Sequence, residues 1–275
     1  MTELMGRYHA HLHRRNLAAR TIAHRVWTVG RLEEHCDGDL LGADVHQIRA
    51  WLDSLNLGPR ARYAYTSALG TFYGWAHDEQ LIDENPMRRL ERPKLPQGLP
   101  RPAPNADLDE AMAVLPDKPR AMVALAAFAG LRCCEIAGLY ADHLIDQGAD
   151  GWLLFVEQGK GSKERTVPLH PRALRALERH GVPRSGPVFH YHRNPSEPLR
   201  PERVSLIGNR ALRAAGIGST MHQFRHWFAT ELYRASKDLR GVGDLLGHSS
   251  MNTTANYTKF DMSHVREHVV GLSWQ

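Results

Sequence analysis

Apolar positions in the first 92 residues recur every three or four residues, the spacing of amphipathic α-helices. Leu4, Tyr8 and Leu12 form the first stripe, and Thr21 stands at the start of the second. Glycine and proline residues separate the stripes and indicate turns. The pattern predicts a small four-helix domain, with apolar stripes over residues 4–12, 22–32, 45–55 and 65–76.

A proline-rich stretch follows, with six prolines between residues 86 and 104. Proline lacks a backbone donor and restricts the residue before it, so the chain should run extended here. A length of 275 residues also fits two domains. We therefore expect a linker at residues 93–105, between a domain at 1–92 and a second at 106–275.

The second half carries a mixed pattern. Its apolar run at 121–131 is too short for a membrane span of about 20 residues, and predicts a buried helix. Asp107 is the candidate cap of the helix before it. Residues 151–157 and 164–169 read as two strands around a glycine–lysine turn. Further helical patterns cover residues 172–180, 201–215, 220–234 and 238–246. The predicted fold class is mainly α (α+β), with a small antiparallel sheet.

Net charge and cysteine content narrow the possible partners and cellular compartment of the protein. A net charge of +5 permits a nucleic-acid partner. Cys36, Cys133 and Cys134 form neither a disulfide framework nor a zinc pattern, which fits a reducing compartment. Residues 1–10 contain no apolar signal-peptide core. These features favour a cytoplasmic protein over a secreted or membrane protein.

Phosphate chemistry is suggested by basic residues at ordered positions. Arg132 and Arg225 offer guanidinium forks that match phosphate oxygens. Lys160 lies in the predicted turn, and His222 shares a helix face with Arg225 at a spacing of three. No P-loop, zinc-protease or serine-hydrolase motif is present in the sequence.

Two residues near the end complete this set. His248 supplies another donor, and the hydroxyl of Tyr257 can attack phosphorus where a base or a positive field activates it. Together the residues suggest covalent phosphoryl transfer without a metal. His222 and His226 have the spacing of a metal pair, but no third ligand is evident, so we expect no metal site.

The motifs GLRCCE, GKGSK, HQFRH and LGH, followed by Tyr257, resemble those of the tyrosine recombinase (phage integrase) family. The segment LIDENP at residues 81–86 extends the resemblance into the first half. It implies a helical core-binding domain, a catalytic domain and a C-shaped clamp around DNA. The similarity is to compact members without an arm-binding domain.

Catalytic roles follow from the resemblance alone. Arg132 and Arg225 match the arginines that hold the scissile phosphate, and Lys160 matches the lysine that protonates the leaving 5′ oxygen. His222 matches a histidine that assists proton transfer at the tyrosine.

Three further positions complete the family's set. His248 matches a position that binds the phosphate and supports the nucleophile, which Tyr257 matches. Glu135 matches an acidic residue with a structural role.

The resemblance also implies partners. These are double-stranded DNA with inverted-repeat core sites, further protomers in a tetrameric synapse joined through the tail at residues 261–275, and an accessory directionality factor. No cofactor, ATP, metal or membrane is implied. The protein is expected to be nucleoid-associated and of prokaryotic or phage origin.

Basic residues outside the motifs are candidate DNA contacts, with a merely solvated surface as the alternative. They are Arg14, Arg15, Arg20, Arg25, Arg60, Arg62 and Lys163. The aromatic residues of the first domain are expected in its core rather than stacked on bases. They are Tyr63, Tyr65, Phe72, Tyr73 and Trp75.

Several functions remain open on the sequence. Integration or excision of a phage or mobile element is the leading hypothesis. Resolution of chromosome or plasmid dimers uses the same chemistry, as does topoisomerase-like relaxation of the type IB kind. A DNA-binding regulator with a degenerate recombinase fold is the non-enzymatic alternative, although it would not need the nucleophile Tyr257.

Overall fold

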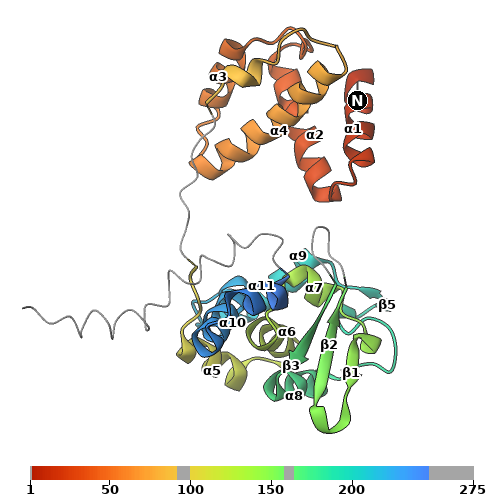
Figure 1. Cartoon of the computed structure of the whole chain (residues 1–275), viewed down its shortest axis with the longest axis vertical. Coiled ribbons are helices and arrows are strands. Elements are labelled where there is room, and N and C mark those ends of the chain that lie inside the picture. The colour runs from red at the N-terminus through yellow and green to blue at the C-terminus, as the bar shows by residue number, and fades with distance from the viewer. Residues whose placement is uncertain (1, 92–99, 158–163, 248–275) are drawn as a thin grey trace, which may run out of the picture. The chain divides into compact units, whose positions relative to one another are not determined.

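The computed structural model describes residues 2–91, 100–157 and 164–247. The chain divides into two compact units, residues 1–97 and 98–275, and each is described by itself (Figure 1). Most of the expected linker lies outside the described residues, and Asn105 already begins a helix. The domain boundaries at residues 92 and 105 stay a prediction.

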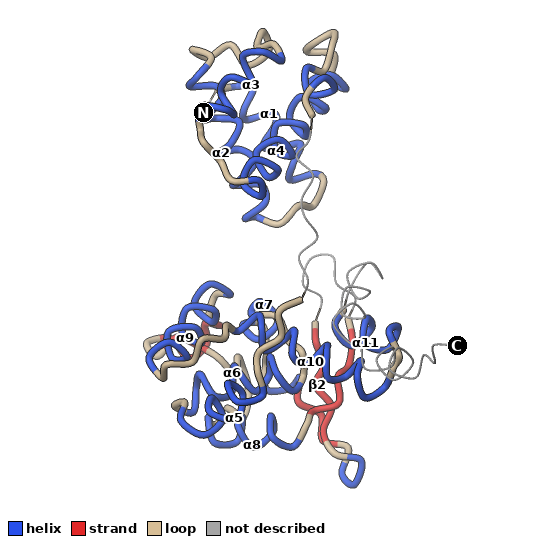
Figure 2. The backbone as a smooth tube through the Cα atoms, turned by 90° about the vertical axis from the view of Figure 1, so that its left-hand side faces the viewer, coloured by secondary structure: helices blue, strands red, loops and turns tan. Residues whose placement is uncertain are grey.

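The first unit contains helices and loops only in its described part (Figure 2). Its elements are α1 (Glu3–Arg14), α2 (Ala19–His35), α3 (Val45–Ser54), α4 (Pro59–Asp78) and the 3-10 turn η1 (Pro86–Arg89). All four predicted helices are therefore confirmed. The second begins at Ala19 rather than Thr21.

Aromatic side chains fill the core of this unit. Phe72, Tyr73 and Trp75 of α4 are buried, and the Tyr8 ring of α1 meets Phe72 edge-on at a centroid distance of 5.1 Å. Such edge-to-face pairs add to the area that they bury. The core prediction is wrong for Tyr63, which is 39% exposed because it faces away from the packed side of α4.

The second unit is mainly helical with a small antiparallel sheet, as predicted. Its helices are α5 (Asn105–Val114), α6 (Asp117–Phe128), α7 (Cys133–Ala137), α8 (Pro171–His180), α9 (Pro201–Ala214), α10 (Met221–Ser236) and α11 (Leu239–Leu246), with 3-10 turns η2 (Ala141–His143) and η3 (Gly148–Asp150). Its strands are β1 (Leu144–Asp146), β2 (Trp152–Val156), β3 (Arg165–Leu169), β4 (His190–Tyr191) and β5 (Asn194–Pro198).

The predicted strand pair is confirmed in β2 and β3, which align Leu154 with Val167 and Val156 with Arg165. The short strand β1 extends this sheet in the order β1-β2-β3, and β4 pairs with β5 separately. The sequence pattern missed β1 and β4 because they are only three and two residues long. It missed β5 because its residues are three polar side chains and two prolines, with no apolar alternation.

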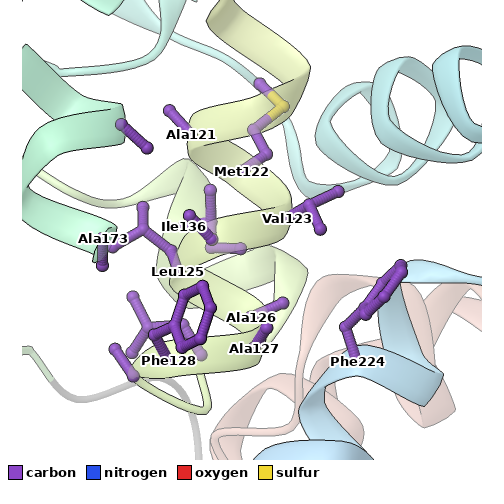
Figure 3. Packing of buried hydrophobic residues seen from close by; sticks show 14 of the residues in the cluster. Ala121, Met122, Val123, Leu125, Ala126, Ala127, Phe128, Ile136, Ala173 and Phe224 are labelled. Atoms are coloured by element: carbon purple, nitrogen blue, oxygen red, sulfur yellow. The ribbon is translucent and has the colours of Figure 1, made fainter. Parts of the chain in front are cut away.

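Helix α6 forms the centre of the unit's core, which confirms the predicted buried helix. Its residues 121–128 are all buried, and Ile136, Ala173 and Phe224 of neighbouring helices belong to the same buried cluster (Figure 3). Small alanine side chains along α6 let these helices approach closely, so the elements that carry the site are packed on one rigid helix.

Asp107 does not cap α5, which begins at Asn105 after Pro104. Its carboxylate instead accepts a hydrogen bond from the backbone N–H of Ser219, at 3.1 Å. This contact joins the first turn of α5 to the residues before α10. The cap prediction failed because a distant backbone donor competes for the same carboxylate.

A tight turn at Gly130 connects α6 to α7. Gly130 has φ +65°, and a Cβ atom added there would lie 2.5 Å from the ring of Phe228 and 3.1 Å from Leu246. Glycine therefore satisfies both a left-handed backbone and a close approach to α10 and α11.

We expect Gly130→Ala to lower the free energy of unfolding by about 2–4 kcal/mol, as the sum of left-handed strain and overpacking. Gly148→Ala is the matched control, because Gly148 has φ +62° and a Cβ atom added there would meet no atom within 4 Å. The control should lose only about 1–2 kcal/mol. Equal losses in urea denaturation would show that the close approach at Gly130 costs nothing.

Candidate active site

The carboxylate of Glu135, in the first turn of α7, is the centre of the site. Its side chain is only 2% exposed. It accepts from the backbone N–H of Arg132 (2.7 Å) and from Arg132 Nη1 (2.9 Å). Arg165 donates both terminal nitrogens to it at 3.0 Å each, and Arg225 Nη1 lies 3.4 Å away. Three guanidinium groups from α10, β3 and the start of α7 thus share one carboxylate.

The same three arginines bind successive carbonyl groups at the end of α11. Arg165 Nε donates to Leu245 (2.7 Å), and Leu246 accepts from both Arg225 Nη2 (2.7 Å) and Arg132 Nη1 (3.2 Å). Arg132 Nη2 lies 3.4 Å from the carbonyl of Gly247. These carbonyls lack partners within the helix and carry its partial negative charge, so cations stabilise them.

Local sequence explains how two of these arginines are presented. Arg132 follows the Gly130 turn and precedes the first residue of α7, so its backbone N–H is free to bind Glu135 as in a capping box. On α10, Gln223 accepts from the backbone N–H of Thr220 at 3.0 Å and fixes the helix start. Arg225 also donates to the carbonyl of Gly130, which anchors α10 to the turn after α6.

Accessibility differs between the two arginines. The side chain of Arg132 is 33% exposed, whereas that of Arg225 is 4% exposed. Arg132 thus also caps carbonyl groups at the end of α11. Its exposed portion is the accessible cation of the described site.

Burial and charge displace the pKa values of this cluster. Burial alone would raise the pKa of Glu135, but hydrogen bonds from Arg165 and the Arg132 backbone, with the nearby positive charges, hold it below its ordinary value. Partial burial lowers the pKa of His222, and the charges of Arg225 and Arg132 lower it further. Burial and His222 lower the pKa of His226 to about 4. Both imidazoles are therefore neutral at pH 7.

The structure brings Arg132, Arg225 and Glu135 together, and His222 lies close enough for both guanidinium charges to lower its pKa. His222 and His226 stack edge-on at a centroid distance of 4.3 Å. Within residues 2–91, 100–157 and 164–247, no three potential ligand side chains gather around a metal position. Four predicted residues and the tail at 261–275 lie outside the described residues: Lys160, Lys163, His248 and Tyr257.

The candidate DNA contacts of the first unit differ in exposure. Arg14, Arg15, Arg20 and Arg60 are exposed, and Arg25 is half-buried. Arg62 instead pairs with Asp53 at 2.6 Å, which joins α4 to α3. An intramolecular partner makes Arg62 the weakest candidate of this group.

Arg165 is the site residue that sequence reasoning missed. It lies on the same face of β3 as the buried Val167 and Leu169, since strand side chains alternate. A charged residue on the buried face of a strand requires a partner of opposite charge. That alternation was the available signal for Arg165.

Comparison with known proteins identifies the family. A model described as the phage integrase family matches residues 106–264. Tyrosine recombinase XerC of Myxococcus xanthus is 30% identical over 257 residues, covering 86% of this chain and 84% of that protein. The chain belongs to the phage integrase family of tyrosine recombinases. Family membership supports site-specific DNA recombination.

Other members and solved structures agree with this assignment. Tyrosine recombinase XerC 2 of Ralstonia nicotianae is 35% identical over 228 residues, which cover 77% of this chain and 64% of that protein. A lambda integrase dimer bound to a COC′ core site has the same fold, with a TM-score of 0.74 at 22% identity over 100% of this chain and 98% of that one. No described helix of the chain is long and apolar enough to span a membrane.

We expect Glu135→Gln to lower the free energy of unfolding by about 3–5 kcal/mol, because it leaves buried guanidinium groups without their anion. Glu157→Gln is the control, since that side chain is 63% exposed and should change stability by less than about 0.5 kcal/mol. Urea denaturation at pH 7 measures both. A Glu135 variant as stable as the control would show that the α11 carbonyls suffice for the arginines.

Acid should destabilise the protein in two stages. In the unfolded chain His226 takes up a proton near pH 6.5, but in the folded protein only near 4, so stability falls as pH drops between these values. The share due to Glu135 is lost only below its ordinary value of 4.5. His222, whose pKa is also lowered, adds to the first stage. His226→Gln should therefore reduce the first stage in urea denaturation without removing it.

Proposed function

We propose that the protein is a site-specific recombinase that cleaves and rejoins DNA through a 3′-phosphotyrosyl intermediate at Tyr257. The observation that carries this proposal is the convergence of Arg132 and Arg225 on Glu135 and on the carbonyl of Leu246. Leu246 lies two residues before His248 in the chain. The paired arginines are thereby attached to the start of the segment that carries the nucleophile.

The charge of the cluster suits a phosphodiester. Three guanidinium groups and one carboxylate leave a net charge of +2 at the site. A phosphodiester carries one negative charge, and more charge develops on its oxygens as the nucleophile attacks. The exposed part of Arg132 would bind the phosphate directly, and Arg225 would support it from the more buried side.

Cleavage would exchange one phosphate ester for another. The oxygen of Tyr257 bonds to phosphorus while the bond from phosphorus to the 5′ oxygen breaks. His222 accepts the tyrosine proton, which its lowered pKa permits at pH 7. Lys160 donates a proton to the leaving 5′ oxygen, and His248 binds the phosphate. Attack by a 5′ hydroxyl of partner DNA reverses the step. Because the energy of the phosphate ester is kept in the phosphotyrosyl bond, the reaction requires neither ATP nor a metal.

Partners follow from the same proposal. Solved relatives of the fold include a lambda integrase tetramer bound to a Holliday junction, and the XerH recombinase bound to a palindromic difH substrate. We infer that this chain binds double-stranded DNA with inverted-repeat core sites and assembles there into a tetramer of its own protomers. The tail at residues 261–275 would join neighbours, and the exposed arginines of α1, α2 and α4 would contact DNA.

Integration or excision of a phage or mobile element is the proposed role. An accessory directionality factor would fit that role. Resolution of chromosome or plasmid dimers remains the competing role for the same chemistry, in a cytoplasmic protein associated with the nucleoid.

Covalent trapping tests the chemistry. The protein is incubated with a library of nicked duplexes, from which the cleaved fragment diffuses away so that an adduct accumulates. We expect the wild type to form a denaturation-resistant adduct, and Tyr257→Phe to form none because it lacks the attacking oxygen. Tyr191→Phe, on β4, is the control and should form the adduct like the wild type.

Sequencing the trapped DNA separates the alternatives. Adducts on one inverted-repeat sequence support recombination at a defined site. Adducts on all sequences alike would favour topoisomerase-like relaxation. Sequence-specific binding without any adduct would favour a regulator, and an adduct formed by Tyr257→Phe would contradict the assigned nucleophile.

A further inference from the structure

We infer that Arg165 is a positioning residue for DNA cleavage, which holds Glu135 and the end of α11 so that Arg132 is directed toward the reacting phosphate. This inference rests on the proposed function. It assigns to the first residue of β3 a role different from that of the phosphate-binding arginines, because Arg165 would act through Glu135 and not through DNA.

The guanidinium of Arg165 binds two groups at once, the carboxylate of Glu135 and the backbone carbonyl of Leu245. Its two terminal nitrogens bind the two carboxylate oxygens of Glu135 at 3.0 Å each, and Nε binds the carbonyl of Leu245 at 2.7 Å. The side chain is 7% exposed, and each of its three guanidinium nitrogens already has an acceptor within the protein. A bidentate fork fixes the plane of a carboxylate as well as its position, which a single ammonium group does not.

Fixing that plane determines what the other arginines can do. Arg132 binds one carboxylate oxygen through Nη1 at 2.9 Å, and Arg225 approaches the other at 3.4 Å. Without Arg165, Glu135 could turn and pair bidentately with the partly exposed Arg132. That pairing would draw the accessible guanidinium away from phosphate and toward the protein.

A second observation shows that the surroundings accommodate Arg165. A Cβ atom at Gly247 would lie 2.8 Å from Arg165 Nη1 and 3.2 Å from its central carbon. Gly247 has φ +61°, so glycine there both ends α11 and leaves room for the guanidinium. Arg165 thus joins β3, whose first residue lies five residues after Lys160 in the sequence, to α11, which precedes His248 and Tyr257 in the sequence.

Charge alone is the competing explanation. A residue that only neutralised Glu135 could be replaced by lysine, because lysine keeps the positive charge. A residue that orients Glu135 could not, because lysine cannot span both oxygens while also reaching the Leu245 carbonyl. Arg165→Lys and Arg165→Gln therefore separate charge from geometry.

The experiment measures single-turnover cleavage of the nicked duplex, affinity for that duplex and thermal stability. We expect Arg165→Lys to cleave about 10- to 100-fold more slowly than the wild type with affinity within about twofold, because small misplacement of a site is costly for rate. Arg165→Gln should be at least as slow. Arg120→Gln is the matched control, since Arg120 is 11% exposed and pairs with Asp117 on α6. It should cleave at the wild-type rate when folded.

Two results would overturn the inference. Arg165→Lys cleaving at the wild-type rate would leave only a charge role. Equal loss of cleavage per folded molecule in Arg165→Gln and Arg120→Gln would leave only a general structural role.

A double-mutant cycle tests the coupling between Arg165 and Glu135 without measuring cleavage. It compares the free energies of unfolding of an Arg165 variant, Glu135→Gln and the double variant. If Arg165 acts through Glu135, the stability losses of the two single variants should not add in the double variant. Additive losses would contradict the link. A wild-type protein that forms no adduct would contradict the proposed function instead, so the two failures are distinguishable.

Discussion

The sharing of one buried carboxylate by three guanidinium groups is the interaction on which the rest of the second unit depends. Two like charges about 4 Å apart repel by about 4 kcal/mol at the effective dielectric constant near a protein surface. Arg132, Arg165 and Arg225 can converge only because Glu135 lies among them. The anion makes a concentrated positive site possible without cancelling it.

Backbone dipoles provide the remaining compensation. The last carbonyls of α11 point at the same guanidinium groups, so the helix end contributes partial negative charge without a second acidic side chain. Glycine at 130 and at 247 makes this geometry possible, because each occupies a left-handed conformation where a side chain would collide with a neighbour. The glycine turns at 130 and 247 are thus as necessary to the site as its charged residues.

The sequence predicted the elements better than their junctions. Helical periodicity located the four helices of the first unit and the buried α6, and alternation located β2 and β3. Asp107 was assigned to the wrong role because its partner, the backbone N–H of Ser219, is 112 residues away. Tyr63 was misplaced because Tyr65 and Phe72 of the same helix contact the core, whereas Tyr63, near the start of α4, faces away from it.

The site was predictable in part. The spacing of Arg225 with His222, and the resemblance that added Glu135, identified residues that the structure places together. The arrangement around Glu135 was not predictable, because it depends on contacts across 30 residues to Arg165 and 90 residues to Arg225. Only the alternation along β3, which places Arg165 on the same face as the buried Val167 and Leu169, indicated Arg165.

These long separations have a consequence for the order in which the molecule forms. Glu135 cannot meet Arg225 until α10 has docked on α6, nor can any arginine meet the α11 carbonyls until the last described helix is in place. Loops of this length close late in folding, because the chain loses conformational entropy on closure before the long-range contact can stabilise it. In a chain still emerging from the ribosome these arginines would therefore lie apart, and competence for recombination would arise only with the completed fold.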